Sequence, residues 1–179
     1  MPRAMAMARA LLLTGTCGSG KTTVSTLLEQ RGWRRISEDD IWRALFEKNR
    51  GAFGSDEHRG KRRQVHEQVR AAVRAALAAG TNVVIDATVH ESPPEAFEDY
   101  RDFFALHRIS WTLRILHPRL DVAVARDASR TTWTLGAGRV ADLRAKFTGV
   151  VFPVACFVDN SDETALETAE RLVADMSER

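Results

Sequence analysis

The stretch "GTCGSGKT", residues 15–22, constrains this chain more than any other part of its sequence. An apolar run at residues 10–13 precedes it, and residues 23–29 continue it with the composition of a helix. Each glycine costs backbone entropy on folding, so Gly15, Gly18 and Gly20 indicate a backbone that turns where other residues are strained. A strand, a glycine loop and a helix that opens on Lys-Thr together indicate a phosphate site.

The spacing of Gly15, Gly20, Lys21 and Thr22 matches the phosphate-loop pattern GxxxxGK[ST] completely. Backbone N–H groups of such a loop surround phosphate oxygens, and the following helix adds a favourable dipole. Lys21 can reach the β- and γ-phosphates and take part in catalysis, and the Thr22 hydroxyl can ligate Mg²⁺. We therefore expect ATP and Mg²⁺ as cofactors. The residues expected to contact the nucleotide are Gly15, Thr16, Cys17, Gly18, Ser19, Gly20, Lys21, Thr22 and Thr23.

Length and composition place the chain among ordinary globular proteins. Its 179 residues are 44% hydrophobic and 28% charged, and the net charge of +2 is too small to indicate nucleic acid by itself. No run approaches the roughly 20 apolar residues of a membrane span, so we expect a cytoplasmic protein without a membrane partner. Cys17 and Cys156 form no CxxC pattern, which fits a reducing compartment. The five histidines form no ligand cluster and are expected at the surface or at helix ends.

Strand-like and helical segments alternate along the chain. Strands are expected at residues 10–14, 33–37, 82–88, 109–117 and 151–158. Helices are expected at residues 21–31, 39–48, 57 or 60 to 79, 92–106, 118–130 and 161–176. This alternation predicts one α/β domain over residues 1–179, a doubly wound five-stranded parallel sheet. Residues 1–9 are expected to be a disordered lead-in, and residues 131–149, which have no clear period, a lid and its return.

Three further stretches carry a resemblance to a known family. They are "ISEDDIW" at residues 36–42, "NVVIDAT" at residues 82–88 and "VARDASR" at residues 124–130. With the phosphate loop, they resemble the small P-loop kinases: polynucleotide 5′-kinases, zeta toxins and chloramphenicol phosphotransferases, which have an ATP-binding domain of the AAA_33 type. The resemblance implies a nucleoside-kinase-like fold with a helical arginine lid and transfer of the γ-phosphoryl group of ATP to a hydroxyl.

The acidic pair Asp39-Asp40 follows the second expected strand. Aligned on the family pattern, Asp39 is the general base that faces the acceptor hydroxyl, and both acids lie on the substrate side. The alternative is helix capping, which fits Asp40 better because Ser37-x-x-Asp40 spaces like a capping box. Polynucleotide kinases usually have an arginine three residues after the first Asp. Here that position is Trp42, and Arg43, a candidate substrate contact, follows it.

Asp86 ends a Walker-B-like strand. The resemblance implies that it holds Mg²⁺ directly or through water, and that Asp86 and Thr88 both lie on the substrate side. The alternative is an Asp that ends the strand and hydrogen-bonds to the phosphate loop. The residues favour neither reading over the other.

Two sets of basic residues complete the expected site. Arg119, Arg126 and Arg130 share one helix face. By resemblance, Arg126 and Arg130 are lid arginines that stabilise the charge of the transferred phosphoryl group, and Arg126 also contacts the nucleotide. The alternative is a solvated basic face. The run at residues 59–64, with Arg62, could hold an anionic acceptor or could be an exposed helix start.

Three functions are consistent with these patterns. The first is a kinase of a small hydroxylated molecule such as an antibiotic, a sugar or a nucleoside. The alternative is a polynucleotide 5′-hydroxyl kinase, in which nucleic acid is the partner. The second alternative is a nucleotide-dependent switch ATPase without a small acceptor. Length and near-neutral charge favour the first, and no pattern sets an oligomeric state.

Overall fold

The computed structural model of the chain describes residues 8–177 apart from positions 48, 50, 53, 91–93, 132, 148 and 150. Most of the expected lead-in, residues 1–7, lies outside the described residues. Just after it, the Arg9 side chain donates a hydrogen bond of 2.6 Å to the carbonyl of Met176. The start of the described chain is thereby attached to the last helix.

Five parallel strands form one sheet. They are β1 (Ala10–Gly15), β2 (Arg34–Ser37), β3 (Val83–Asp86), β4 (Trp111–Leu116) and β5 (Phe157–Val158). The order across the sheet is β2-β3-β1-β4-β5, and every neighbouring pair is parallel. The predicted α/β class and five-stranded parallel sheet are therefore confirmed. Because all strands run the same way, their carboxyl ends share one edge, where ligands bind in such sheets.

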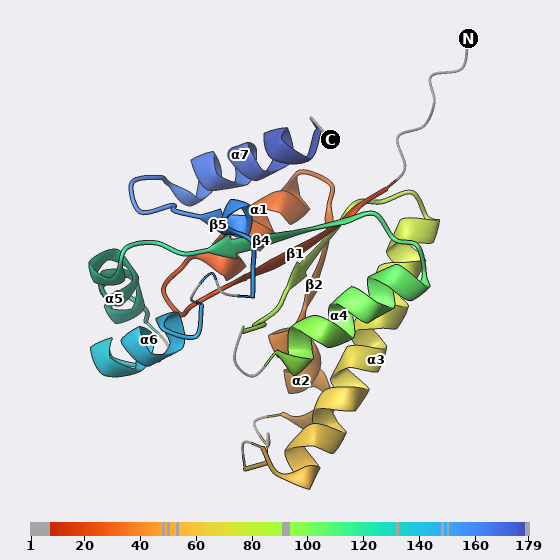
Figure 1. Cartoon of the computed structure of the whole chain (residues 1–179), viewed down its shortest axis with the longest axis horizontal. Helices are drawn as coiled ribbons and strands as arrows, with labels where there is room; N and C mark the ends of the chain where they lie inside the picture. The colour runs from red at the N-terminus through yellow and green to blue at the C-terminus, as the bar shows by residue number, and fades with distance from the viewer. Residues whose placement is uncertain are drawn as a thin grey trace.

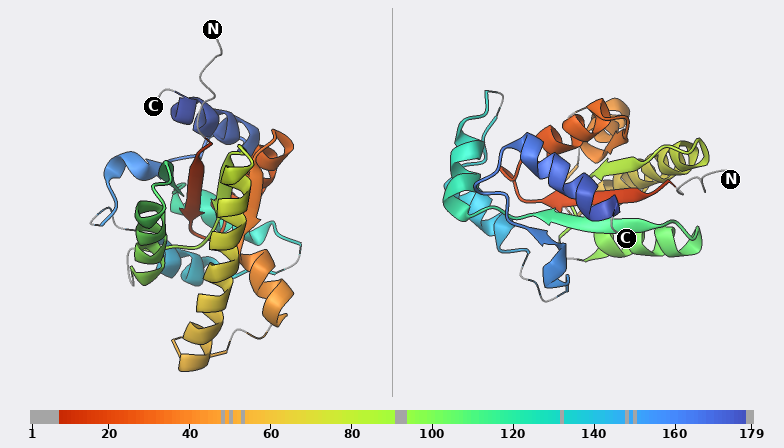
Figure 2. Two further views of the ribbon diagram at one scale, coloured as in Figure 1. Left: turned by 90° about the vertical axis from the view of Figure 1, so that its right-hand side faces the viewer. Right: turned by 90° about the horizontal axis from the view of Figure 1, so that it is seen from above.

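Helices cover both faces of this sheet (Figure 1). They are α1 (Lys21–Gln30), α2 (Glu38–Phe46), α3 (Asp56–Ala78), α4 (Glu95–Leu106), α5 (Leu120–Ala128), α6 (Ala137–Arg144) and α7 (Ala165–Ser177). Figure 1 shows α1 and α7 on one face, α3 and α4 on the other, and α5 and α6 beyond the carboxyl ends of β1 and β4. Seen from above in Figure 2, α7 lies across the strands.

Alternating residues of β1 supply both hydrophobic cores. Leu11 and Leu13 are fully buried in the core that includes Val24 and Leu28 of α1. Leu12, which points the other way, packs into the core that contains the valines of α3 and the aromatic residues of α4. A strand that is apolar on both faces is the pattern of a sheet covered twice. Burial of each leucine contributes about 1.5–3 kcal/mol to stability.

The last predicted strand is much shorter than expected. Residues 151–158 were predicted to form a buried strand, but the structure has a 3₁₀ turn at Val154–Cys156 and pairs only Phe157–Val158 with β4. Pro153 begins this turn, and its carbonyl accepts a 2.9 Å hydrogen bond from the amide of Cys156. Val154 is 80% exposed. The prediction was wrong in extent because an apolar run beside a proline formed a turn instead of a ladder.

The segment 131–149 also differs from expectation, because it contains the helix α6. The helix begins after Gly136, whose φ is 81°, and it buries Val140 completely. One glycine and two arginines hide its period, since Val140 is the only buried residue that α6 contributes. Among the described helices, none combines the length and apolar character needed to cross a bilayer.

Candidate functional site: a phosphate loop and an adjoining cleft

The glycine loop joins β1 to α1 and follows a path that only glycine permits. Gly15, Gly18 and Gly20 have φ values of 146°, 74° and 91°. A Cβ on Gly18 would lie 2.0 Å from the carbonyl oxygen of Ala123 in α5. A Cβ on Gly15 would lie 2.3 Å from the carbonyl oxygen of Leu116 in β4. The loop is therefore pressed against both neighbouring elements, which fixes its backbone N–H groups in place.

The start of α1 provides the features of an anion site. Gly20 is its N-cap in the left-handed conformation, and no side chain caps the first amides. The Lys21 ammonium donates 2.8 Å and 3.4 Å hydrogen bonds across the loop to the carbonyls of Gly15 and Thr16. The buried Ser19 hydroxyl has no hydrogen-bond partner among the described residues. Uncapped amides, a helix dipole and an unpaired hydroxyl together suit phosphate oxygens.

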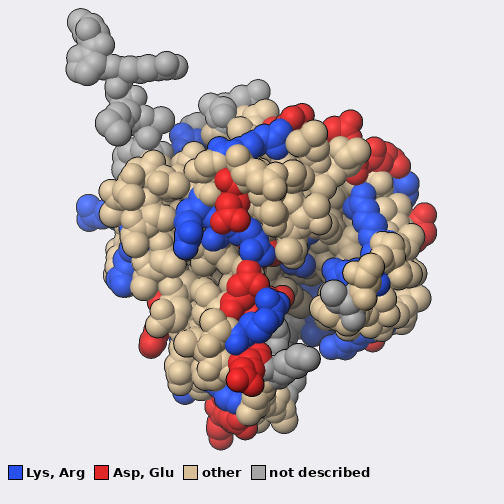
Figure 3. Space-filling model, turned by 180° about the vertical axis from the view of Figure 1, so that it is seen from behind, with Lys and Arg blue, Asp and Glu red and all other residues tan. Residues whose placement is uncertain are grey.

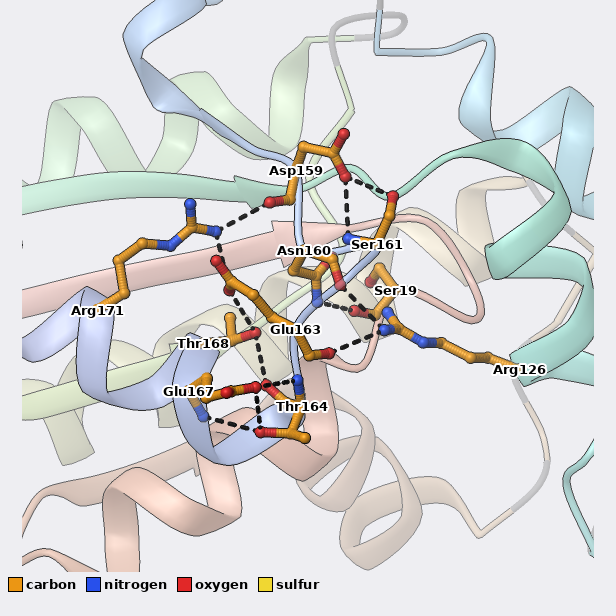
Figure 4. A network of polar contacts seen from close by, with 10 residues as sticks. All are labelled: Ser19, Arg126, Asp159, Asn160, Ser161, Glu163, Thr164, Glu167, Thr168 and Arg171. Carbon is orange, nitrogen blue, oxygen red and sulfur yellow. Dashed lines mark hydrogen bonds and ion pairs between the residues drawn. The ribbon is translucent and has the colours of Figure 1, made fainter.

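Arg126 connects α5 with the loop between β5 and α7. Its guanidinium donates hydrogen bonds of 2.9 Å and 3.2 Å to the carbonyls of Asn160 and Glu163 (Figure 4). The Asn160 amide in turn donates a 3.0 Å hydrogen bond to the carbonyl of Ser19 in the phosphate loop. Asn160 Oδ1 is buried without a hydrogen-bond partner among the described residues. Arg126 therefore lies beside the phosphate loop, on the side of β5.

The other two predicted arginines of this helix face are also engaged with protein groups. Arg119, at the start of α5, forms two 2.8 Å hydrogen bonds with Asp162. Arg130 lies 3.6 Å from Asp127, and its guanidinium stands 5.1 Å from the ring centroid of Trp133. The prediction of one arginine face was wrong in extent, because α5 spans only Leu120–Ala128. Arg119 is the N-cap of this helix, Arg130 lies beyond its end, and each has different partners.

A cleft of about 680 Å³ adjoins the phosphate loop at the carboxyl edge of the sheet. The loop contributes Cys17, α2 contributes Asp39, α3 contributes Arg62, and Thr88 follows β3. Lys146, just after α6, also lines the cleft. Figure 3 shows acidic and basic side chains alternating down one side of a hollow in this part of the surface. The cleft brings together five of the six predicted substrate-side residues, all except Asp40: Asp39, Arg43, Arg62, Asp86 and Thr88.

The two neighbouring acids of α2 have different environments. Asp39 lines the cleft, whereas the Asp40 carboxylate pairs with Arg35 at 2.8 Å and with Arg43 at 2.9 Å. The Asp40 amide also donates a hydrogen bond to the Ser37 hydroxyl, so Ser37 caps α2 at the predicted spacing. Burial is the largest influence and alone would raise the pKa of Asp40, but the hydrogen bonds and charges of Arg35, Ser37 and Arg43 together outweigh it and lower that pKa. Asp40 is therefore held as a paired carboxylate.

Asp86, at the end of β3, is 7% exposed and partnered by two groups. Its Oδ2 accepts a 3.0 Å hydrogen bond from Ser25 of α1 and a 3.1 Å hydrogen bond from Arg35 of β2. Arg35 thus joins Asp86 to Asp40. The sequence reading did not single out Arg35. Its place in the expected strand, where two adjacent arginines stand between Trp33 and Ile36, was the available signal.

A second group of polar residues missed by the sequence reading lies in the wall of the cleft. Glu38 Oε1 accepts a 2.5 Å hydrogen bond from Tyr100 and lies 3.2 Å from His66 Nε2. His66 Nδ1 lies 3.0 Å from Asp99 Oδ2. His66 is 3% exposed, so the expectation of surface or helix-end histidines was wrong for it. The four-residue spacing of His58, Arg62 and His66 was the signal, because such residues share one helix face.

The cleft is rich in positive charge. Arg62, Arg139 and Lys146 all line it, and they come from three separate segments. Beside them, His90 has its pKa lowered to about 4, first by burial and then by the charges of Lys146, Lys21 and Arg62. Burial is the larger cause, and the three cations add to it, so the potential around His90 is positive and favours anionic ligands.

Comparison with known proteins agrees with this geometry. No curated protein was found whose sequence matches that of the chain. Among solved structures, the tunicamycin resistance protein of Deinococcus radiodurans has a TM-score of 0.69 at 18% identity, over 94% of this chain and 95% of that one. The APS kinase CysC of Mycobacterium tuberculosis, solved with AMPPNP and APS, has a TM-score of 0.65 at 20% identity, over 96% and 98%.

A third similar structure, a gluconokinase of Sinorhizobium meliloti, has a TM-score of 0.58 at 18% identity, over 96% of this chain and 97% of that one. These likenesses show that the chain has the fold of the small P-loop kinases. The family model AAA_33, described as AAA domain, matches residues 11–150. That match covers most of the sequence and includes the phosphate loop, Asp39 and the arginines of α5 and α6, and the chain therefore belongs to the AAA domain family.

Proposed function

We propose that the protein is an ATP-dependent phosphotransferase that moves the γ-phosphoryl group of ATP to a hydroxyl of a small molecule. The observation that carries this proposal is the single cleft that joins Cys17 of the phosphate loop to Asp39 of α2. A donor phosphate on the loop and a hydroxyl beside Asp39 would share one cavity. Its volume of about 680 Å³ is within the usual range for sites of small ligands.

In this proposal Asp39 accepts the proton of the acceptor hydroxyl. A carboxylate suits this step because it can orient the hydroxyl and take its proton as phosphoryl transfer proceeds. Lys21 is already directed across the loop by its hydrogen bond to Gly15 and would interact with the β- and γ-phosphates. Asp40 is committed to Arg35 and Arg43, which supports Asp39 as the base.

Thr22 and Asp86 would hold Mg²⁺. Thr22 is exposed in the first turn of α1, and Asp86 lies at the end of the neighbouring strand β3. Arg35 and Ser25 both hydrogen-bond to Oδ2 of Asp86, so its other oxygen is the one suited to the ion or to a water on it. When bound, Mg²⁺ neutralises phosphate charge. Ser25 and Arg35 fix the orientation of the carboxylate.

We assign the arginines two roles, contact with the nucleotide and support of the lid. Arg126, tied to the loop that follows β5, is proposed to contact the nucleotide beside the phosphate loop. Arg130 would support the lid through its contact with Trp133, a cleft residue. Arg139 of α6 lies in the cleft itself, where its guanidinium would meet an anionic ligand.

A screen of ATP consumption tests this function. The purified protein is incubated with Mg²⁺ and ATP against nucleosides, sugars, antibiotics and 5′-hydroxyl oligonucleotides. We expect consumption to rise with one class of small hydroxylated acceptor and to vanish in Lys21→Ala. Consumption that no acceptor increases would favour the switch ATPase instead.

A polynucleotide 5′-hydroxyl kinase is the second candidate. The rings of Trp42 and His58 stack in the cleft at 5.5 Å with an interplanar angle of 22°, and Trp133 is 56% exposed at its margin. Aromatic side chains of this kind can stack on bases. The Pnkp1/Rnl/Hen1 RNA repair complex includes a chain of similar fold, with a TM-score of 0.58 at 18% identity. Oligonucleotide-specific ATP consumption in the same screen would select this candidate.

A further inference from the structure

Glu38 and Asp86, two of the acidic residues that line the cleft, and their neighbour Asp40 have partners within the protein. Asp40 and Asp86 share Arg35. Glu38 accepts hydrogen bonds from Tyr100 and from the amide of Thr88, and it also lies against His66. These three carboxylates are therefore balanced by groups in the walls. They do not need the other cations of the cleft.

Two of those cations have no such balance. Arg62 and Arg139 form no ion pair or hydrogen bond with any residue that the structure describes, although both line a cleft that contains several carboxylates. Arg62 is half-buried on α3, and Arg139 is exposed on α6. A half-buried guanidinium without a counter-charge can form charge-assisted hydrogen bonds with a bound anion.

The position of Arg62 separates it from the nucleotide phosphates. It lies one helical turn before His66, which contacts Glu38, the neighbour of the candidate base Asp39. Lys21, by contrast, points across the phosphate loop to the carbonyl of Gly15. The positive charge of the cleft therefore extends from the ATP side to the acceptor side.

We propose that the acceptor carries an anionic group in addition to its hydroxyl, and that Arg62 binds that group with help from Arg139 and Lys146. This inference rests on the proposed phosphotransferase function and narrows its substrate class to hydroxylated anions such as sugar phosphates, sulfates or hydroxy acids. The planar guanidinium of Arg62 can bind a phosphate, sulfate or carboxylate through two parallel hydrogen bonds. Arg139 and Lys146 would complete the site from the lid side.

His90 provides a reporter that lies inside the site. Burial and the charges of Lys146, Lys21 and Arg62 hold its pKa at about 4. An anion beside Arg62 would offset part of that positive potential and raise the pKa of His90. The imidazole resonances of His90 should therefore titrate at higher pH when the acceptor-side anion is bound.

The test uses small anions as probes on the intact protein saturated with Mg²⁺ and AMPPNP, so that the nucleotide phosphates are already in place. Sulfate and acetate are titrated separately, and binding is followed by NMR of the His90 ring. Arg62→Gln is compared with Arg63→Gln, because Arg63 is the exposed neighbour that does not line the cleft. Arg62→Lys and the melting temperature of each variant control for folding.

We expect one anion to bind the AMPPNP complex and to raise the pKa of His90. Arg62→Gln should weaken that binding by about tenfold or more, the scale of one lost charge-assisted contact, while Arg63→Gln leaves it unchanged. Preference for sulfate over acetate would indicate a phosphorylated or sulfated acceptor, and the reverse a carboxylate. Equal binding by wild type and Arg62→Gln, or no binding to the AMPPNP complex, would overturn the inference. Failure of AMPPNP itself to bind would instead overturn the phosphotransferase function.

Discussion

Asp39 and Asp40 are neighbours in sequence, but of the two only Asp39 lines the cleft. Asp40 bridges Arg35 and Arg43, and its amide is capped by Ser37, whereas Asp39 lines the cleft. Successive residues of a helix point about 100° apart, so the two side chains cannot share a role. One step along α2 therefore separates the candidate base, Asp39, from Asp40, which stabilises the start of the helix.

We predict different consequences for Asp39→Asn and Asp40→Asn. Asp39→Asn should lower kcat by roughly 10²-fold or more with little change in ATP affinity, because it removes a positioned base. Asp40→Asn should mainly lower the melting temperature, by a loss of about 1 kcal/mol, since it weakens ion pairs at the start of a helix. Turnover and thermal unfolding of both variants are the measurements. Loss of turnover in Asp40→Asn alone would move the base by one residue.

His90 should make the folded protein sensitive to mild acid. Its pKa is about 4 in the fold, against about 6.5 in an unfolded chain. The unfolded state therefore binds more protons below pH 6.5, so the free energy of unfolding decreases as the pH falls from about 6.5 toward 4. Above pH 6.5 both states leave His90 neutral, and its contribution stays constant.

The measurement is the melting temperature between pH 7.5 and pH 5. His90→Gln should lose less stability over this interval than the wild type, because its side chain does not titrate. His107→Gln is the matched control, since His107 is exposed and lies outside the cleft. Parallel pH curves for wild type and His90→Gln would contradict the assigned environment of His90.

The candidate site could be predicted from the sequence only where residues form local patterns. The phosphate loop, the Asp39-Asp40 pair and Arg62 all follow from short motifs or runs. The hydrogen bond between Arg35 and Asp86 could not be predicted in this way, because it joins β2 to β3 across 51 positions of the chain. Burial of His66 depends in the same way on Glu38 and Asp99 from two other helices.

At the scale of elements, the phosphate loop depends on its contact with α5. Gly18 packs so closely against Ala123 that α5 supports the loop. Arg126 of the same helix reaches the carbonyl of Asn160, and Asn160 contacts Ser19. The helix α5 thus ties the loop to the segment after β5, so displacement of α5 should change nucleotide binding.

Gly18→Ala tests this dependence against a control with equal backbone strain. Gly80 has a φ of 75°, almost that of Gly18, but a Cβ there would meet nothing within 4 Å. Gly80→Ala should therefore cost only the strain of a left-handed alanine, about 1–2 kcal/mol. Gly18→Ala should cost more and should also weaken AMPPNP binding, measured by calorimetry. Equal effects of the two changes on stability and binding would exclude the α5 contact as a support of the loop.

For the whole molecule, the order of strands and helices was predictable because periodicity is a local property. The parallel class of the sheet follows from alternating elements, and the buried run Leu11-Leu12-Leu13 marks its centre. The extents of β5 and α6 were not predictable from the same patterns. β5 has only two residues and α6 buries only one side chain. Their lengths therefore depend more on packing against β4 and α5 than on their own sequence.

The central claim for the whole molecule is that the γ-phosphoryl group of ATP passes from the phosphate loop to a hydroxyl held beside Asp39. The most direct measurement is the fate of a labelled γ-phosphoryl group in a single turnover with the acceptor found in the screen, in wild type, Lys21→Ala and Asp39→Asn. We predict that the wild type places the label on the acceptor and that both variants lose this product while remaining folded. Label that appears only as inorganic phosphate, or on the acceptor at undiminished rates in a folded Lys21→Ala protein, would contradict the claim.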